Sequence, residues 1–185
     1  MLKKILFIAA LVMSAAALAA DEEGIEVKAK KQGDAIVIDL SMTVAATPQE
    51  VWAVLVDYDH MTEFLSNLQS SKIVEKNGNV WKVAQKGQSS HGPVSFSFEN
   101  LREVDVQPYD TIRSHLISGT MKKLEGFTQL TAAGNVTRVA YHSESVSGVW
   151  VPPMVGTSIV EDEVRKQFQD MRAEIVRRKT AKSAD

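Results

Sequence analysis

Two kinds of hydrophobic periodicity divide the chain. From Ala35 to Val44 apolar and polar residues alternate, which predicts a long strand with one buried face. Near the end of the chain the apolar residues instead recur every three or four positions, as in an amphipathic helix: Ile159, Val160, Val164, Phe168, Met171 and Ile175. This spacing predicts a final helix over about residues 153–179. Its start follows Pro152-Pro153, because proline suits the first turn of a helix.

The segments between these two elements predict two short helices and then a run of strands. Thr47-Pro48-Gln49-Glu50 has the residues of a capping box, which predicts a helix start, and residues 57–60 indicate a break before a second short helix. From about residue 70 to 145 six strands follow, separated by turn signals such as Asn77-Gly78. The pattern therefore predicts an α+β fold in which a curved antiparallel sheet of about seven strands wraps around the final helix.

The first 20 residues have the pattern of a secretory signal peptide. Basic Lys3 and Lys4 precede an apolar run, and Ala17-Leu18-Ala19 offers a cleavage site of small residues. We expect cleavage and export, and an uncleaved anchor is the alternative. The chain has no cysteine, and export without disulfides fits a bacterial periplasm. The expected organisation is a signal peptide (1–20), an N-terminal segment (21–34), one domain (35–180) and a short tail (181–185).

The charge balance excludes one class of partner. Removal of the signal peptide leaves 19 basic and 23 acidic residues. A mildly acidic protein is a poor candidate for binding nucleic acid, which favours basic patches. We therefore expect no nucleic-acid partner.

Several short motifs together resemble a known superfamily. They are residues 46–52 (ATPQEVW), 57–65 (DYDHMTEFL) and 70–75 (SSKIVE), followed by Glu125-Gly126 and the final amphipathic helix. In order and spacing the chain resembles the START-like, or SRPBCC, superfamily, and within it the polyketide cyclase/dehydrase and coenzyme Q-binding-protein group. It departs from the pattern at Ser66, where relatives often have proline. The resemblance implies a helix-grip (START/Bet v 1-like) fold with a cavity between sheet and helix. Members commonly bind sterols, lipids, quinones or polyketides there, and a minority are enzymes.

Candidate catalytic residues are few. The histidines at 60, 91, 115 and 142 lack metal-binding spacing, and the chain has neither a nucleophile elbow nor a thiol. We interpret Asp57 and Asp59, beside His60, as capping and turn residues rather than as an acid–base pair. The sequence thus predicts no catalytic residue, metal or cofactor.

Binding residues are better represented. We expect the inner faces of the strands to present aromatic side chains and three hydroxyl groups, and a buried hydroxyl needs a partner that a ligand can supply. The apolar loop around Trp150 is a lid, a plug or a membrane contact, and by analogy with the fold Tyr58 and Met61 line the same mouth. The candidate ligand-binding residues are Tyr58, Met61, Trp81, Phe96, Phe98, Ser114, Thr128, Tyr141, Trp150 and Met154.

Three hypotheses follow for the function. The first is a periplasmic binding or carrier protein for an apolar small molecule, such as a lipid, quinone or polyketide-like compound, with a transient membrane contact when the ligand is exchanged. The second is a cyclase/dehydrase-type enzyme that acts on a polyketide-like or aromatic substrate. The third is an interaction protein whose cavity is filled by its own side chains. The oligomeric state is left open.

Overall fold

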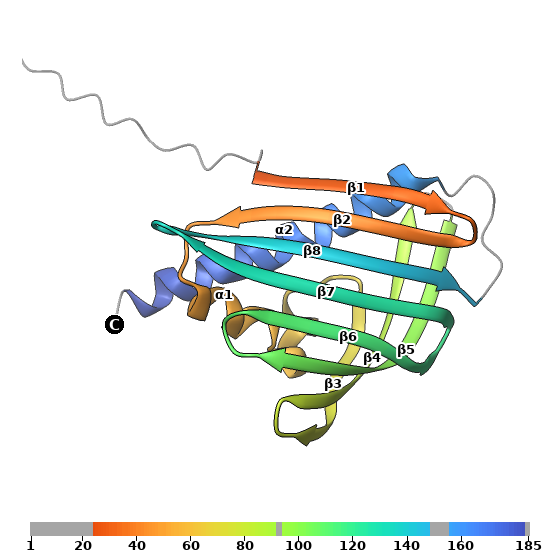
Figure 1. The fold of residues 1–185 in the computed structure, drawn as a ribbon, viewed down its shortest axis with the longest axis horizontal. Coiled ribbons are helices and arrows are strands. Elements are labelled where there is room, and N and C mark those ends of the chain that lie inside the picture. Colours follow the sequence, from red (N-terminus) through yellow and green to blue (C-terminus); the bar gives the residue numbers. More distant parts are fainter. Residues whose placement is uncertain (1–23, 92–93, 149–155, 184–185) are drawn as a thin grey trace, which may run out of the picture.

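The computed structural model describes residues 24–91, 94–148 and 156–183. Within these ranges the chain forms one antiparallel sheet and three helical segments (Figure 1). The strands are β1 (Ile25–Gln32), β2 (Ala35–Val44), β3 (Leu68–Asn77), β4 (Val80–His91), β5 (Val94–Gln107), β6 (Thr111–Gly119), β7 (Met121–Ala133) and β8 (Val136–Ser147). Their order in the sheet is β1-β2-β8-β7-β6-β5-β4-β3. The predicted α+β class with a curved antiparallel sheet is confirmed.

The sheet of the described residues has eight strands, where the sequence predicted about seven. The additional strand, β1, lies in the segment expected to precede the domain, and it pairs with β2 along its whole length. Ile25, Val27 and Ala29 are buried, whereas the lysines between and after them are exposed. This strand is thus an edge with one apolar face, and the sheet begins about ten residues before Ala35, where the sequence predicted its first strand.

The two short helices lie where the sequence placed them, between β2 and β3. Helix α1 (Pro48–Leu55) begins with the predicted capping box: the backbone N–H of Glu50 donates to the Thr47 hydroxyl, and the backbone N–H of Thr47 donates to the Glu50 carboxylate at 2.8 Å. The second is a 3₁₀ helix, η2 (Tyr58–Glu63), whose Tyr58 and Met61 are buried. Each helix therefore turns an apolar face to the sheet.

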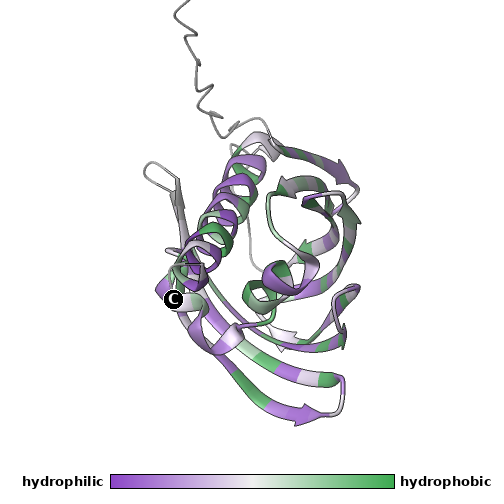
Figure 2. Cartoon of the chain, turned by 90° about the vertical axis from the view of Figure 1, so that its left-hand side faces the viewer, coloured by the Kyte–Doolittle hydropathy of each residue, from purple (hydrophilic) through white to green (hydrophobic). Residues whose placement is uncertain are grey.

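The long C-terminal helix, α2 (Thr157–Lys182), starts four residues later than predicted and ends three residues later. It packs mainly against β1, β2 and α1. Polar contacts fix it there, since the backbone N–H of Ala29 donates to Glu161 at 2.7 Å and Arg165 donates to the carbonyl of Ile25 at 2.5 Å. Figure 2 shows α2 as one long helix beside the curved strands, with apolar and polar positions alternating along it. None of the helices described is long and apolar enough to cross a membrane.

Candidate functional site

Burial on the inner face of the sheet decreases from one end of the strands to the other. Near α1, the side chains of Val104, Ile112, Leu130 and Val139 are buried. Toward the opposite end the apolar side chains are only half-buried: Phe96 and Phe98 on β5, Leu116 on β6 and Leu124 on β7. The N-terminal half of α2, which lies at this end, is also only partly buried. Apolar side chains that solvent still reaches form the candidate binding surface, and we call these four residues the open apolar end.

A chain of polar side chains lies on the same inner face, between the open apolar end and η2. Arg102 of β5 stands in register between Val83, which is fully buried, and Leu116. Its guanidinium donates to the side-chain oxygen of Gln85 on β4. The Gln85 amide in turn donates to the buried Ser71 hydroxyl at 3.0 Å. The register and these bonds together place a positive charge inside the curve of the sheet.

Tyr58, the first residue of η2, lies beside this cluster. Only 5% of the residue is exposed, and its ring makes an edge contact with Trp81 at a centroid distance of 6.4 Å. Burial raises the pKa of the Tyr58 hydroxyl, although the positive charge of Arg102 acts in the opposite direction. Tyr58 is therefore a protonated hydrogen-bond donor at neutral pH. Trp81 itself belongs to the β3–β4 hairpin, since its indole N–H donates to the Gly78 carbonyl at 3.0 Å.

The three hydroxyl residues singled out from the sequence lie on neighbouring strands. Thr128 of β7 pairs with Tyr141 of β8, and Ser114 of β6 pairs with Gly126 of β7. A Cβ at position 126 would lie 2.7 Å from the Ser114 hydroxyl and 4.0 Å from that of Tyr141, so glycine leaves space for both. The Tyr141 ring contacts Phe168 of α2 at 5.3 Å between centroids, which joins this group to the helix.

The predicted site residues thus fall into three groups. Phe96, Phe98, Ser114, Thr128 and Tyr141 are half-buried on the inner face. Tyr58 and Met61 are 5% and 4% exposed, so they lie below the surface rather than at an open mouth, and Trp81 packs against Tyr58. Trp150 and Met154 lie outside the described residues.

The sequence interpretation missed Arg102 and Gln85. A signal for Arg102 was available, because Phe96 and Phe98 share a face and alternation carries that face on through Asn100 to Arg102 and Val104. The structure keeps this alternation in β5, since the register shift beside Arg102 leaves out a residue of β6 instead. An arginine on a strand face that also carries Phe96, Phe98 and Val104 was therefore detectable as an interior charge.

The acidic residues of the helix break tie η2 to its neighbours. Asp57 makes no capping bond; its carboxylate lies 2.6 Å from His60 Nδ1 and 2.8 Å from the Arg178 guanidinium of α2. Partial burial raises the pKa of Asp57, but these two partners lower it overall, and the same hydrogen bond raises the pKa of His60. Asp59 accepts the backbone N–H of Ile73 on β3 at 2.9 Å. Asp59 thus ties η2 to β3, whereas Asp57 pairs with charged side chains and does not cap the helix as predicted.

The buried Glu174 continues this network on α2. Arg177 and Arg178 each donate to its carboxylate at 2.6 Å, and the hydrogen bond from Arg177, followed by that from Arg178, lowers the pKa of Glu174 from 4.5 to about 2. Arg178 thus bridges Glu174 and Asp57. This bridge fastens the C-terminal half of α2 to η2.

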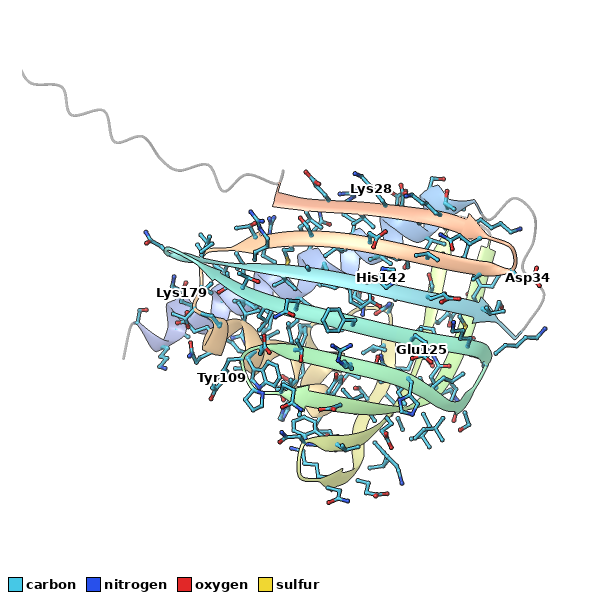
Figure 3. All side chains as sticks on the ribbon, viewed as in Figure 1. Lys28, Asp34, Tyr109, Glu125, His142 and Lys179 are labelled. Atoms are coloured by element: carbon cyan, nitrogen blue, oxygen red, sulfur yellow. The ribbon has the colours of Figure 1, made fainter. Side chains whose placement is uncertain are left out.

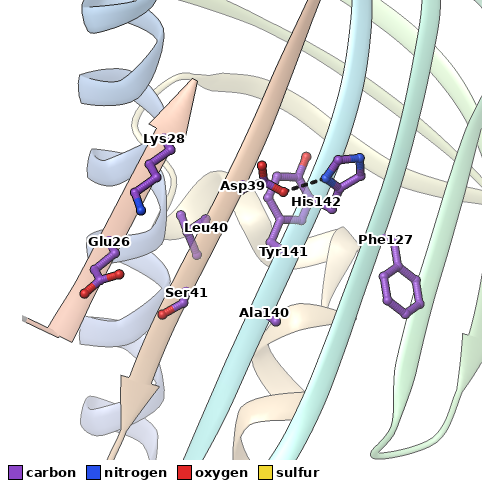
Figure 4. Close-up of a pocket in the computed structure, with 9 residues that line it drawn as sticks. All are labelled: Glu26, Lys28, Asp39, Leu40, Ser41, Phe127, Ala140, Tyr141 and His142. Carbon is purple, nitrogen blue, oxygen red and sulfur yellow. Dashed lines mark hydrogen bonds and ion pairs between the residues drawn. The ribbon is translucent and has the colours of Figure 1, made fainter. Parts of the chain in front are cut away.

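The outer face of the sheet carries two hollows. Figure 4 shows the first, of about 380 Å³, where Asp39 and His142 Nδ1 are 2.7 Å apart. The second, of about 500 Å³, adjoins it and contains the Glu103–His115 pair. Figure 3 shows His142 and Glu125 on this face, turned away from α2. Exposed pairs of this kind contribute little stability, and no group of three or more ligating side chains suited to a metal occurs in the described parts of the chain.

Residues 44–172 match the sequence profile of the family described as polyketide cyclase / dehydrase and lipid transport. The chain belongs to this family. No curated protein matches the chain by sequence. The family is associated with the binding of lipids and other apolar small molecules, and its members include cyclases.

Solved structures share the fold. A STAR-related lipid transfer protein from Xanthomonas axonopodis is 15% identical, with a TM-score of 0.71; the match covers 85% of this chain and 96% of that one. The Zhui aromatase/cyclase from Streptomyces sp. R1128 is 16% identical, with a TM-score of 0.66 and coverage of 78% and 95%. A START superfamily protein from Mycobacterium smegmatis is 11% identical, with a TM-score of 0.65 and coverage of 76% and 97%. The helix-grip architecture expected from the resemblance is thereby confirmed.

Proposed function

We propose that the protein binds and carries an apolar small molecule, such as a lipid, a quinone or a polyketide-like compound, between the inner face of the sheet and α2. The observation that carries this proposal is the open apolar end: Phe96, Phe98, Leu116 and Leu124 face inward and yet remain partly exposed. Apolar side chains gain free energy when an apolar ligand displaces the water that reaches them. The family membership of residues 44–172 supports the same function.

The inner face favours binding over acid–base catalysis. The described histidines at positions 60, 115 and 142 are exposed, and their rings pair with exposed or half-buried carboxylates outside the inner face. Of the inner-face groups, Tyr58 has a raised pKa, so it is a poor general base at neutral pH. A cyclase/dehydrase-type reaction would need an ionisable group poised near the working pH.

The proposed setting is the bacterial periplasm. The first 20 residues support it, because a basic start, an apolar run and small residues at the expected cleavage site have the pattern of a signal peptide. Osmotic-shock fractionation of cells that express the full chain tests the location. A mature protein of reduced mass in the periplasmic fraction is the expected result, whereas the full-length mass in the cytoplasmic fraction would contradict it.

Native mass spectrometry of the purified mature protein, followed by organic extraction, tests the binding function. An apolar mass that leaves on denaturation is the expected result. A ligand-free mass, together with no uptake of quinones, fatty acids or a fluorescent lipid, would refute the proposal and favour an interaction protein.

A matched pair of variants then tests on which face of the sheet the ligand binds. Phe98→Ala truncates an aromatic side chain of the open apolar end, while Phe127→Ala truncates one on the outer face, where Arg113 lies over the ring at 4.3 Å. We expect Phe98→Ala to weaken binding at least about fivefold, since a phenyl ring contributes on the order of 1 kcal/mol or more of apolar contact. Phe127→Ala should leave affinity unchanged. Equal effects of the two variants would place the ligand elsewhere.

A further inference from the structure

Arg102 carries a positive charge inside the sheet without a carboxylate to balance it. In the described part of the chain its side chain forms no ion pair, and its one hydrogen bond goes to the neutral amide of Gln85. Its neighbours across the sheet on the same face are Val83 and Leu116, both apolar. Among the described inner-face residues of β4, β5 and β6, Arg102 is the single cationic side chain, while Lys76 of β3 lies over the Trp81 ring at 3.9 Å.

Such an arrangement is costly unless an anion completes it. Arg102 is half-buried, so its guanidinium has lost part of its hydration, and one neutral hydrogen bond replaces that loss only in part. A carboxylate restores the balance best, because the planar guanidinium fork matches its two oxygens and forms two charge-assisted hydrogen bonds. A single cation also matches a single negative charge better than a doubly charged phosphate.

The surroundings of Arg102 set the orientation of a ligand. On one side lies buried Tyr58, close enough for the charge of Arg102 to act on its hydroxyl, which stays protonated and can donate a hydrogen bond. On the other side Phe98 and Phe96 follow on the same face of β5. Six residues of a strand span about 20 Å at ~3.3 Å per residue, so the distance from Arg102 to Phe96 suits a long alkyl or polyisoprenoid tail.

From this arrangement we propose that the ligand is an amphiphile with one carboxylate, which enters head first and pairs with Arg102 while its apolar tail lies along Phe96, Phe98, Leu116 and Leu124. This inference rests on the binding function proposed above and adds to it the ligand's head group and direction. Gln85 and Ser71 hold the guanidinium in place, since their hydrogen bonds fix the amide that accepts from it.

A comparison of two ligands with the same tail tests the head group. Hexadecanoic acid and hexadecanol are titrated into delipidated protein, and affinity is measured by calorimetry. We expect the acid to bind at least about tenfold more tightly than the alcohol, because a charge-assisted pair with arginine is worth about 1.5–3 kcal/mol. Equal affinities would overturn the carboxylate assignment while leaving apolar binding intact, whereas no binding of either ligand would instead count against the proposed function. Hexadecyl phosphate is the third ligand, and binding as tight as that of the acid would overturn the choice of carboxylate over phosphate.

Two variants assign the preference to Arg102. Arg102→Met keeps an unbranched side chain of similar length without the charge, and it should remove the preference for the acid while leaving the affinity for the alcohol nearly unchanged. Arg113→Met, on the outer face of the neighbouring strand β6, should retain the preference. A preference that survives in Arg102→Met would overturn the proposal. Arg102→Gln provides the same test with a polar side chain, and circular dichroism of each variant verifies the fold.

Discussion

Replacement of Glu174 by glutamine should make the protein less stable and should reduce its loss of stability in acid. Glu174 is 8% exposed on α2, and it accepts hydrogen bonds from Arg177 and Arg178. Because Arg178 also pairs with Asp57, the carboxylate of Glu174 helps to hold the bridge between α2 and η2. Glutamine keeps the size of the side chain, but it removes the charge and replaces one of the two acceptor oxygens by an NH2 donor.

The pKa of Glu174 sets the size of the effect. It falls from 4.5 to about 2 on folding, and each pKa unit corresponds to about 1.4 kcal/mol, so the ceiling is about 3–4 kcal/mol. The Arg177 side chain is 68% exposed, and solvent screens its contribution, so we expect a loss of about 1–2 kcal/mol at neutral pH. Since the pKa is lower in the folded state, this stabilisation is complete above the unfolded value near 4.5 and disappears as the pH falls toward about 2. Less than half remains at about pH 3.

Urea unfolding at about pH 7 and about pH 3 measures both quantities. The difference in unfolding free energy between wild type and Glu174→Gln should shrink by more than half at the lower pH. Glu163→Gln is the matched control, because Glu163 lies on the same helix and forms no ion pair among the described residues. If Glu174→Gln were as stable as wild type at neutral pH, or if the difference between them were the same at both pH values, the bridge would not have the role assigned to it.

Three further perturbations test other contacts. Asp57→Asn removes the partner that raises the pKa of His60, so in an NMR titration the His60 ring should lose its proton at lower pH than in wild type; an unchanged midpoint would contradict the pairing. Thr137→Val removes the buried hydroxyl that donates to the carbonyl of Ala46 at 2.7 Å. In urea unfolding we expect the free energy of unfolding to fall by about 1–2 kcal/mol. An unchanged free energy would mean that water replaces the hydrogen bond. Gly87→Ala would place a Cβ 2.2 Å from the backbone oxygen of Asn67 and 2.6 Å from the ring of Phe98. The melting temperature of this variant should therefore fall by several degrees. A wild-type melting temperature would show that the neighbouring backbone moves at little cost in free energy.

The elements that the sequence predicted well are those with a strong period or a specific end signal. The alternation from Ala35 to Val44 and the capping box at Thr47 both correspond to observed elements. Strand β1 was missed because its inward positions include a small residue, Ala29, and its outward positions carry lysines, which together resemble a solvated segment. The apolar residues of this segment can be recognised as one face of a strand only when α2, the element that covers them, is known.

The candidate site was predicted less completely, for a related reason. Alternation predicts that Phe96 and Phe98 face inward. The same alternation places Arg102 inward, against the simple rule that charged residues lie outside. The positions of Tyr58 and Met61 depend on how η2 packs against β4, and no local pattern sets that contact. Contacts between residues far apart in the sequence thus determine the positions of Tyr58 and Met61, which hydrophobic periodicity does not predict.

The pairing of β1 with α2 also has a consequence for biosynthesis. The apolar face of β1 is formed near the beginning of the sequence, but α2, which packs against it, comes more than 120 residues later: Ala29 bonds to Glu161 and Ile25 to Arg165. A nascent chain therefore exposes Ile25, Val27 and Ala29 until nearly all of the protein has left the ribosome. Until α2 has been synthesised, the apolar face of β1 is not buried, and a chaperone that recognises short apolar segments can bind it.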